Sequence, residues 1–240
     1  MENSAFGRLI GVLVAPQKTF RSIAERPTWL VAFLVLALSP LLGGLVAKPK
    51  IDWEEVARHQ IERSAVDLTP AQVEQQVEIT AKIGPFFIYA APVFMLVGVL
   101  LFALVFWGAF TLAGGEPGFK RSLAVTVHAM MPMVVAGLLA VPVILGMDTI
   151  PPEVLETGGY LKSNLGAFAP EGAGIVLVTF LSKIDVFTIW CLVLCAIGFT
   201  HAAKVKARTA AITVGLLWLV WVVVTVGLAG IGALMGGKKG

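Results

Sequence analysis

The chain has 240 residues, of which 58% are hydrophobic and 14% charged, with a mean hydropathy of +0.88. Soluble domains average roughly 45–50% apolar and about 25% charged residues, and a small globule cannot hide such an excess of apolar surface. Two cysteines exclude a disulfide scaffold, and a net charge of +3 with dispersed basic residues excludes nucleic-acid binding. After these exclusions, the class that fits the composition is an integral membrane protein.

Residues 1–26 are predicted to form a cytoplasmic amphipathic segment. Apolar residues recur at helical spacing from Phe6 to Leu13 and again at Phe20 and Ile23, and Pro16 is suited to open a second helical piece. The interleaved cations are predicted to contact lipid headgroups: Lys18, Arg21 and Arg26. The alternative is a plain lead-in to the first span. The apolar stretch before Pro16 is too short for a cleaved signal peptide, so we expect the first span to act as its own insertion signal.

Long windows without charged residues predict a membrane domain over residues 27–240. A helix needs about 20 mostly apolar residues to cross the hydrocarbon core, and backbone groups in lipid must be paired within the segment. The predicted fold class is therefore an all-α integral membrane protein with an N-terminal amphipathic interfacial helix and five transmembrane helices, at about 28–47, 84–111, 122–146, 184–203 and 210–235. Four prolines lie inside the spans and predict local kinks that shape packing, with a gating hinge as the alternative: Pro40, Pro92, Pro132 and Pro142.

Two outside loops, 48–83 and 147–183, connect these spans. In the first loop, Asp52 as an N-cap and a Thr69–Gln72 capping box predict short helices over 53–65 and 70–83. The second loop is rich in proline and glycine, which predicts irregular structure. Its apolar stretch 172–182 is too short to span, and it is either an interfacial or re-entrant helix or part of a longer fourth span.

Positive charge predicts that the N-terminus is cytoplasmic and the C-terminus outside. The segments that this orientation places inside are 1–26, 112–122 and 200–210, and they hold nine basic and three acidic residues. The rest of the chain holds nine basic and twelve acidic residues. Since Lys and Arg in short loops stay on the cytoplasmic side, we expect a multi-pass protein of the inner (cytoplasmic) membrane.

Two polar residues of the spans are candidate functional groups. Asp185 begins the fourth span, where a carboxylate either needs a partner or water path or caps the helix at the headgroups. His128 lies in the third span, where an imidazole either relays protons or forms a structural hydrogen bond. Whether Asp185 is functional or a cap stays open at this point.

The sequence predicts no catalytic, cofactor or metal site. Cys191 and Cys195 are four residues apart, but no further ligands complete a zinc site, so we interpret them as packing residues. Phosphate-binding glycine loops and common hydrolase motifs are missing from the sequence. Small residues over Gly227–Gly236 predict close helix packing, either within the chain, with a membrane-protein partner or in a homo-oligomer.

Three stretches resemble the bacterial branch of the Yip family, the Ypt-interacting-protein superfamily of membrane proteins. The first contains Pro16, Thr19, Phe20, Pro27 and Trp29; the second contains Gly118, Leu123, Val125 and Pro132; the third contains Asp185, Phe187, Trp190 and Gly198. The resemblance implies a five-span fold with a cytoplasmic N-terminus. Eukaryotic members bind Rab-type GTPases, but the motifs typical of that branch are missing here, which makes GTPase binding doubtful.

These observations favour a non-catalytic membrane protein with a scaffold, interaction or membrane-organisation role. The alternative is a small transporter or lipid-moving protein in which Asp185 and His128 line a kinked helix bundle. We expect membrane lipids as partners and no enzyme activity.

Overall fold

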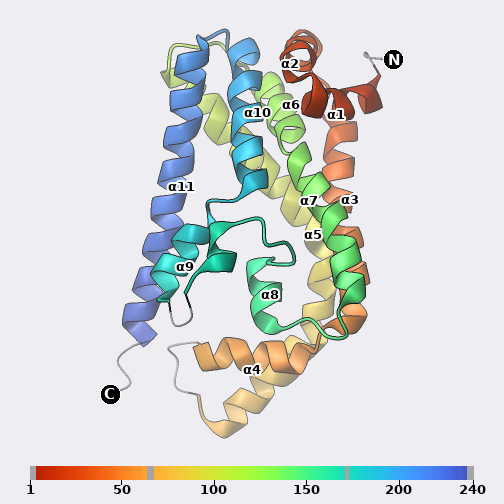
Figure 1. Cartoon of the computed structure of the whole chain (residues 1–240), viewed down its shortest axis with the longest axis vertical. Coiled ribbons are helices and arrows are strands. Elements are labelled where there is room, and N and C mark those ends of the chain that lie inside the picture. Colours follow the sequence, from red (N-terminus) through yellow and green to blue (C-terminus); the bar gives the residue numbers. More distant parts are fainter. Residues whose placement is uncertain (1–3, 64–67, 171–172, 237–240) are drawn as a thin grey trace. The chain divides into compact units, whose positions relative to one another are not determined.

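The computed structural model describes residues 4–63, 68–170 and 173–236, and their regular structure is helical (Figure 1). Within these ranges there is no strand, and extended backbone pairs in a bridge between Asn164 and Asp185. The helices, with η marking short 3-10 helices, are α1 (Ala5–Val14), α2 (Pro16–Glu25), α3 (Leu30–Ala47), η1 (Lys48–Lys50), α4 (Trp53–Arg63), α5 (Pro70–Leu112), α6 (Phe119–Ala129), α7 (Met131–Gly146), α8 (Pro152–Thr157), η2 (Leu165–Phe168), α9 (Ile175–Ser182), α10 (Val186–Ala202) and α11 (Ala207–Gly236).

Four helical segments are long and apolar enough to cross a membrane. They are Leu30–Lys50, Pro70–Leu112, Phe119–Gly146 and Ala207–Gly232, and between 11% and 28% of each apolar window is buried. An apolar helix surface left uncovered by protein is typical of contact with lipid. The remaining predicted span, 184–203, corresponds to α10, an apolar helix of 17 residues that is shorter than these four segments.

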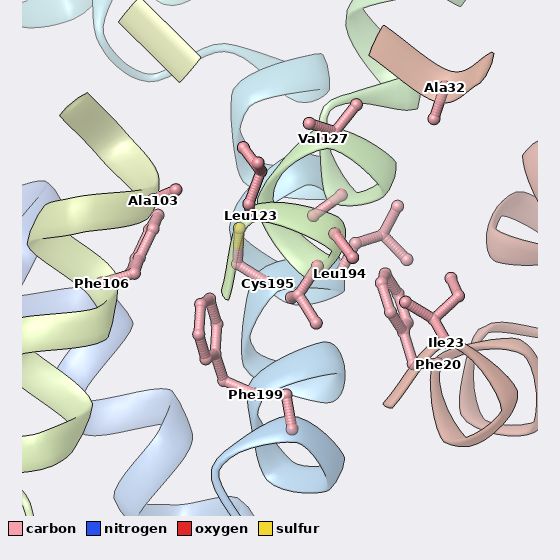
Figure 2. Packing of buried hydrophobic residues seen from close by; sticks show 14 of the residues in the cluster. Phe20, Ile23, Ala32, Ala103, Phe106, Leu123, Val127, Leu194, Cys195 and Phe199 are labelled. Carbon is pink, nitrogen blue, oxygen red and sulfur yellow. The ribbon is translucent and has the colours of Figure 1, made fainter. Parts of the chain in front are cut away.

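The described residues form two compact units, and α3, α5, α7 and α11 contribute to both. The first unit comprises Met1–Ser39, Pro92–Gly137 and Val186–Trp221. Its core is a cluster of buried apolar side chains from α2, α5, α6 and α10 (Figure 2). The Phe199 ring of α10 stacks on Phe110 of α5, with ring centroids 4.3 Å apart and an interplanar angle of 8°, and this contact fixes the two helices side by side.

The second unit comprises Pro40–Ala91, Leu138–Asp185 and Val222–Gly240. It contains the predicted outside loops and a small apolar cluster that includes Val56, Ile144 and Ile150. The predicted caps are confirmed: Asp52 accepts hydrogen bonds from the amides of Glu54 and Glu55 at 3.0 Å. Thr69 and Gln72 form the expected capping box at the start of α5.

The prediction of separate helices over 70–83 and 84–111 is wrong, because α5 runs as one helix of 43 residues. Gly84, the first residue of the predicted span, is a packing position: a Cβ at this residue would collide with the ring of Trp53. The predicted span 122–146 instead divides into α6 and α7 at Met130. Pro132 is the second residue of α7, so its missing amide falls in a first turn where the cost is small.

The longer version of the fourth span, with Lys183 and Asp185 inside it, is also excluded. α9 ends at Ser182 and α10 begins at Val186, and Asp185 between them lies in the extended bridge with Asn164. The apolar stretch is therefore a helix of its own. Residues 64 and 65, at the end of the predicted helix 53–65, lie outside the described residues.

Candidate functional site at the N-terminal arm

The three family-like stretches meet at one point in the first unit. Phe20 of α2 is fully buried against α10 at Gly198, and Val125 of α6 completes the contact. A Cβ at residue 198 would lie 2.5 Å from Val125 and 3.0 Å from the Phe20 ring, so glycine is required for this close approach. Figure 2 shows Phe20 and Ile23 directed toward α6 and α10. Three residues that carry the resemblance, Phe20, Val125 and Gly198, thus form a packing junction.

The helices α1 and α2 form a hairpin, which we call the N-terminal arm (residues 4–29). Pro16 is the first residue of α2, as predicted. The hairpin closes where a Cβ at Gly11 would lie 2.6 Å from the Thr19 hydroxyl, while that hydroxyl donates to the Ala15 carbonyl at 2.9 Å. The arm packs on α6 and α10 (Figure 1). It is therefore an integral part of the first unit.

Arg8 is buried inside the arm, with 4% of its surface exposed. Its guanidinium donates to the Arg26 carbonyl at 2.8 Å, to the Thr28 hydroxyl at 3.0 Å and to the Ser22 hydroxyl at 3.1 Å. All three acceptors are neutral, and Nε has no partner among the described residues. Since a buried charge needs hydrogen bonds to remain inside, this side chain ties the middle of α1 to the end of α2 and to the residues that precede α3.

The two helices of the arm expose different surfaces. α2 buries Phe20 and Ile23 and exposes Lys18 and Arg21, with Arg26 exposed just beyond its end. α1 buries Arg8 and Val12 and exposes three apolar side chains at a spacing of four residues: Phe6, Ile10 and Val14. The predicted headgroup residues thus share the exposed side of α2 and its C-terminal end, and the exposed side of α1 carries no charge.

Several other residues of the resemblance lie elsewhere in the first unit. Trp29 packs on the core and contacts Phe33, with ring centroids 6.0 Å apart, and Pro27 follows the end of α2. Gly118 is the N-cap of α6 at φ +63°, a conformation that favours glycine. Phe187 and Trp190 lie in the first turns of α10, where Trp190 packs against the core.

Asp185 lies in the second unit and joins two segments of the predicted outside loop. Its carboxylate accepts a hydrogen bond from the Ser163 hydroxyl at 2.5 Å, and the Leu165 amide donates to the Ile184 carbonyl at 3.1 Å. No spacing pattern could have identified Ser163, because it precedes Asp185 by 22 positions, with η2 and α9 in between.

His128 lies in the first unit and is buried, with 2% of its surface exposed. Its Nδ1 donates to the Ala124 carbonyl one turn earlier, at 2.8 Å. Cys195 is buried in the same core, and Cys191 lies one turn away on α10. Cys195 therefore belongs to the apolar core and His128 is bonded within its own helix, while Asp185 belongs to the other unit.

An acidic groove of about 500 Å³ lies in the second unit, between α4 and α8. Five carboxylates line it together with Arg58 and His59, and His59 Nδ1 lies 3.6 Å from a Glu153 oxygen. Across the described ranges, no group of three or more His, Cys, Asp and Glu side chains is placed to hold a metal ion. The glycines Gly227 and Gly232 of α11 have open space around them, and a Cβ at Gly230 would approach Val176 at 3.6 Å.

Comparisons with known proteins give a family match and one relative. The family model described as the Yip1 domain matches residues 10–229. The membrane protein YknW of Bacillus subtilis is 24% identical over 216 residues, which cover 90% of this chain and 87% of that protein. No solved structure gives a significant match. The matched residues extend from α1 into α11, so the similarity includes most of the arm and the whole junction.

Proposed function

Because the chain belongs to the Yip1 domain family, we propose that it is a non-catalytic membrane scaffold whose N-terminal arm gathers anionic lipids at the cytoplasmic leaflet. The observation that carries this proposal is the convergence of the family-like stretches on an apolar junction, Phe20–Val125–Gly198, with basic residues on the exposed side. A packed junction holds helices in place, and exposed cations attract anionic headgroups by about 1 kcal/mol for each Lys or Arg.

We further propose that α10 is a fifth span and that the N-terminus is cytoplasmic. A helix of 17 residues is about 25 Å long, at the lower limit of lengths that cross a bilayer. This topology gives the cytoplasmic side the arm and the basic loops before α6 and α11. The same topology puts the acidic groove, and the hydrogen bond between Ser163 and Asp185, on the outer side of the inner membrane.

A partner surface on α11 is the third part of the proposal. The open glycines Gly227 and Gly232 support contact with another helix, either of a different membrane protein or of a second copy of this chain. The alternative transport function lacks comparable support, because His128 and Asp185 each bind a local partner in a separate unit.

The lipid role is tested by removing the charges of α2 and the residue after it. The chain carrying Lys18→Gln, Arg21→Gln and Arg26→Gln is extracted from membranes in polymer-bounded nanodiscs, and the ratio of anionic to zwitterionic lipid is compared with that of the unchanged protein. We expect the enrichment in anionic lipid to fall at least twofold. The matched control removes three exposed cations of the second unit, Arg58, Lys82 and Lys162, and should retain the enrichment. Equal ratios in both variants would contradict the proposal.

A further inference from the structure

The exposed surface of α1 is unusual for a helix that lies next to basic residues. Phe6, Ile10 and Val14 are 69%, 65% and 75% exposed, and they follow one another at successive turns of the helix. The single charged residue of α1, Arg8, has turned away from this surface into the arm. An apolar stripe of this kind is stable only if something apolar covers it.

Position along the chain argues that lipid is the cover. Arg8 donates to the Thr28 hydroxyl, and Leu30, two residues later, begins the membrane-crossing segment Leu30–Lys50. The middle of α1 is therefore held at the N-terminal end of a transmembrane helix, where headgroups give way to acyl chains. The exposed cations of α2 adjoin it in the same hairpin and attract an anionic surface.

We propose that α1 lies submerged in the leaflet, with Phe6, Ile10 and Val14 among the acyl chains and α2 above it at the headgroups. Arg8 points into the arm, where its guanidinium donates hydrogen bonds to Arg26, Thr28 and Ser22. Insertion of α1 therefore does not carry the cost of exposing this charge to hydrocarbon. The proposal rests on the membrane role of the arm proposed above. It adds that α1 inserts by apolar contact alone and acts as a wedge in the leaflet.

The depth of each helix can be measured in the full-length protein. Cys191 and Cys195 are replaced by Ala, and single cysteines at Ile10, Gln17 or Leu38 carry a nitroxide label. The protein is reconstituted in vesicles of phosphatidylcholine and phosphatidylglycerol. Collision rates with oxygen, which concentrates among acyl chains, and with a water-soluble nickel chelate are read by electron spin resonance. Leu38 is an exposed position in α3 and serves as the acyl reference, and Gln17 is an exposed position in α2 and serves as the headgroup reference.

We expect the label at residue 10 to match the label at residue 38, with an oxygen-to-nickel collision ratio at least fivefold above that at residue 17. A ratio equal to that at residue 17 would overturn the proposal. Protection of residue 10 from both oxygen and nickel would also overturn it, because protein would then cover the stripe. Either failure leaves the anionic-lipid enrichment intact if the proposed function holds, so the two proposals can fail separately.

Labels at Phe6 and Val14 repeat the measurement at the two other positions of the stripe, so the result does not depend on one variant that folds poorly. Both should give the ratio found at residue 10, since all three side chains share one exposed side of α1. Ratios at residues 6 and 14 that match the headgroup reference would contradict a submerged helix.

Discussion

Gly198 occupies the point where α2, α6 and α10 come closest, and any side chain there must displace a neighbour. Phe20 and Val125 are both fully buried, so neither has free space to move into. Overfilling a packed site of this kind costs about 1–3 kcal/mol. The resulting strain would act on the attachment of the arm, which contacts α10 through α2.

We therefore expect Gly198→Val to destabilise the first unit and to detach the arm in part. The matched control is Gly215→Val in α11, where a Cβ has nothing within 4 Å. The measurement is thermal unfolding of both variants in detergent. The expected midpoint falls for Gly198→Val by several degrees and stays near that of the unchanged protein for Gly215→Val. Similar midpoints for the two variants would mean that the junction tolerates added volume.

Arg8 provides a second test at this scale. Arg8→Met keeps much of the apolar stem and removes the donors to Arg26, Thr28 and Ser22. Since hydrogen bonds to charged groups contribute about 1.5–3 kcal/mol, we expect the amides of α1 to exchange with solvent at least tenfold faster, with α6 and α10 unchanged. Hydrogen exchange read by mass spectrometry measures this. Unchanged exchange in α1 would show that apolar packing alone holds the hairpin closed.

Asp185 is expected to act as a structural pin. Asp185→Ala removes the acceptor of the Ser163 hydroxyl, whereas Asp185→Asn retains a side-chain oxygen that can accept the same bond. Limited proteolysis of the loop 158–170 in nanodiscs should accelerate several-fold in the first variant and only slightly in the second. If Asp185→Ala leaves cleavage unchanged but alters the flux of a solute in liposomes, the pin interpretation is wrong and the transport alternative gains its first support.

At the scale of helices, the sequence identified most elements because local signals define them. Asp52, Thr69 and Pro16 begin helices where the capping rules place them. The continuity of α5 through Gly84 was not predictable, because the window without charged residues begins only after Lys82 and the contact between Gly84 and Trp53 is tertiary. The separation of α9 from α10 depends likewise on a bridge between residues far apart in sequence.

The topology of α10 is a prediction that belongs to this scale. In a chain without its native cysteines, Glu62→Cys and Lys206→Cys place single thiols at exposed positions on either side of the predicted crossings. We expect a membrane-impermeant maleimide to label residue 62 in intact spheroplasts and residue 206 only after permeabilisation. Labelling of residue 206 in intact spheroplasts would mean that α10 does not cross and that the chain has four spans.

At the scale of the whole molecule, composition alone predicted the membrane class, because no soluble fold can cover so much apolar surface. The division into two units could not be predicted, since each of α3, α5, α7 and α11 contributes to both. The inward turn of Arg8 was also beyond sequence reasoning. An arginine in a helix is normally expected to be exposed. The groups that accept hydrogen bonds from Arg8 and allow it to be buried lie 14 to 20 residues later in the chain.

The corresponding prediction concerns the expressed protein as a whole. Because four segments are long and apolar enough to cross a bilayer, we expect the chain to stay in the pellet after alkaline carbonate washing and ultracentrifugation, and to enter solution only with detergent. A peripheral membrane protein, released by carbonate, serves as the control. Recovery of this chain in the carbonate supernatant would refute the membrane assignment.

The junction between Phe20 and Gly198 also sets a condition on biosynthesis. The two residues leave the ribosome about 180 codons apart, which at 5–20 residues per second is a delay of roughly 10 to 40 s. Throughout that interval the apolar side of α2, which carries Phe20 and Ile23, cannot pack against α10 because α10 has not yet been synthesised. A stalled or truncated nascent chain would keep this surface uncovered, and it would become a target for chaperones and quality-control proteases.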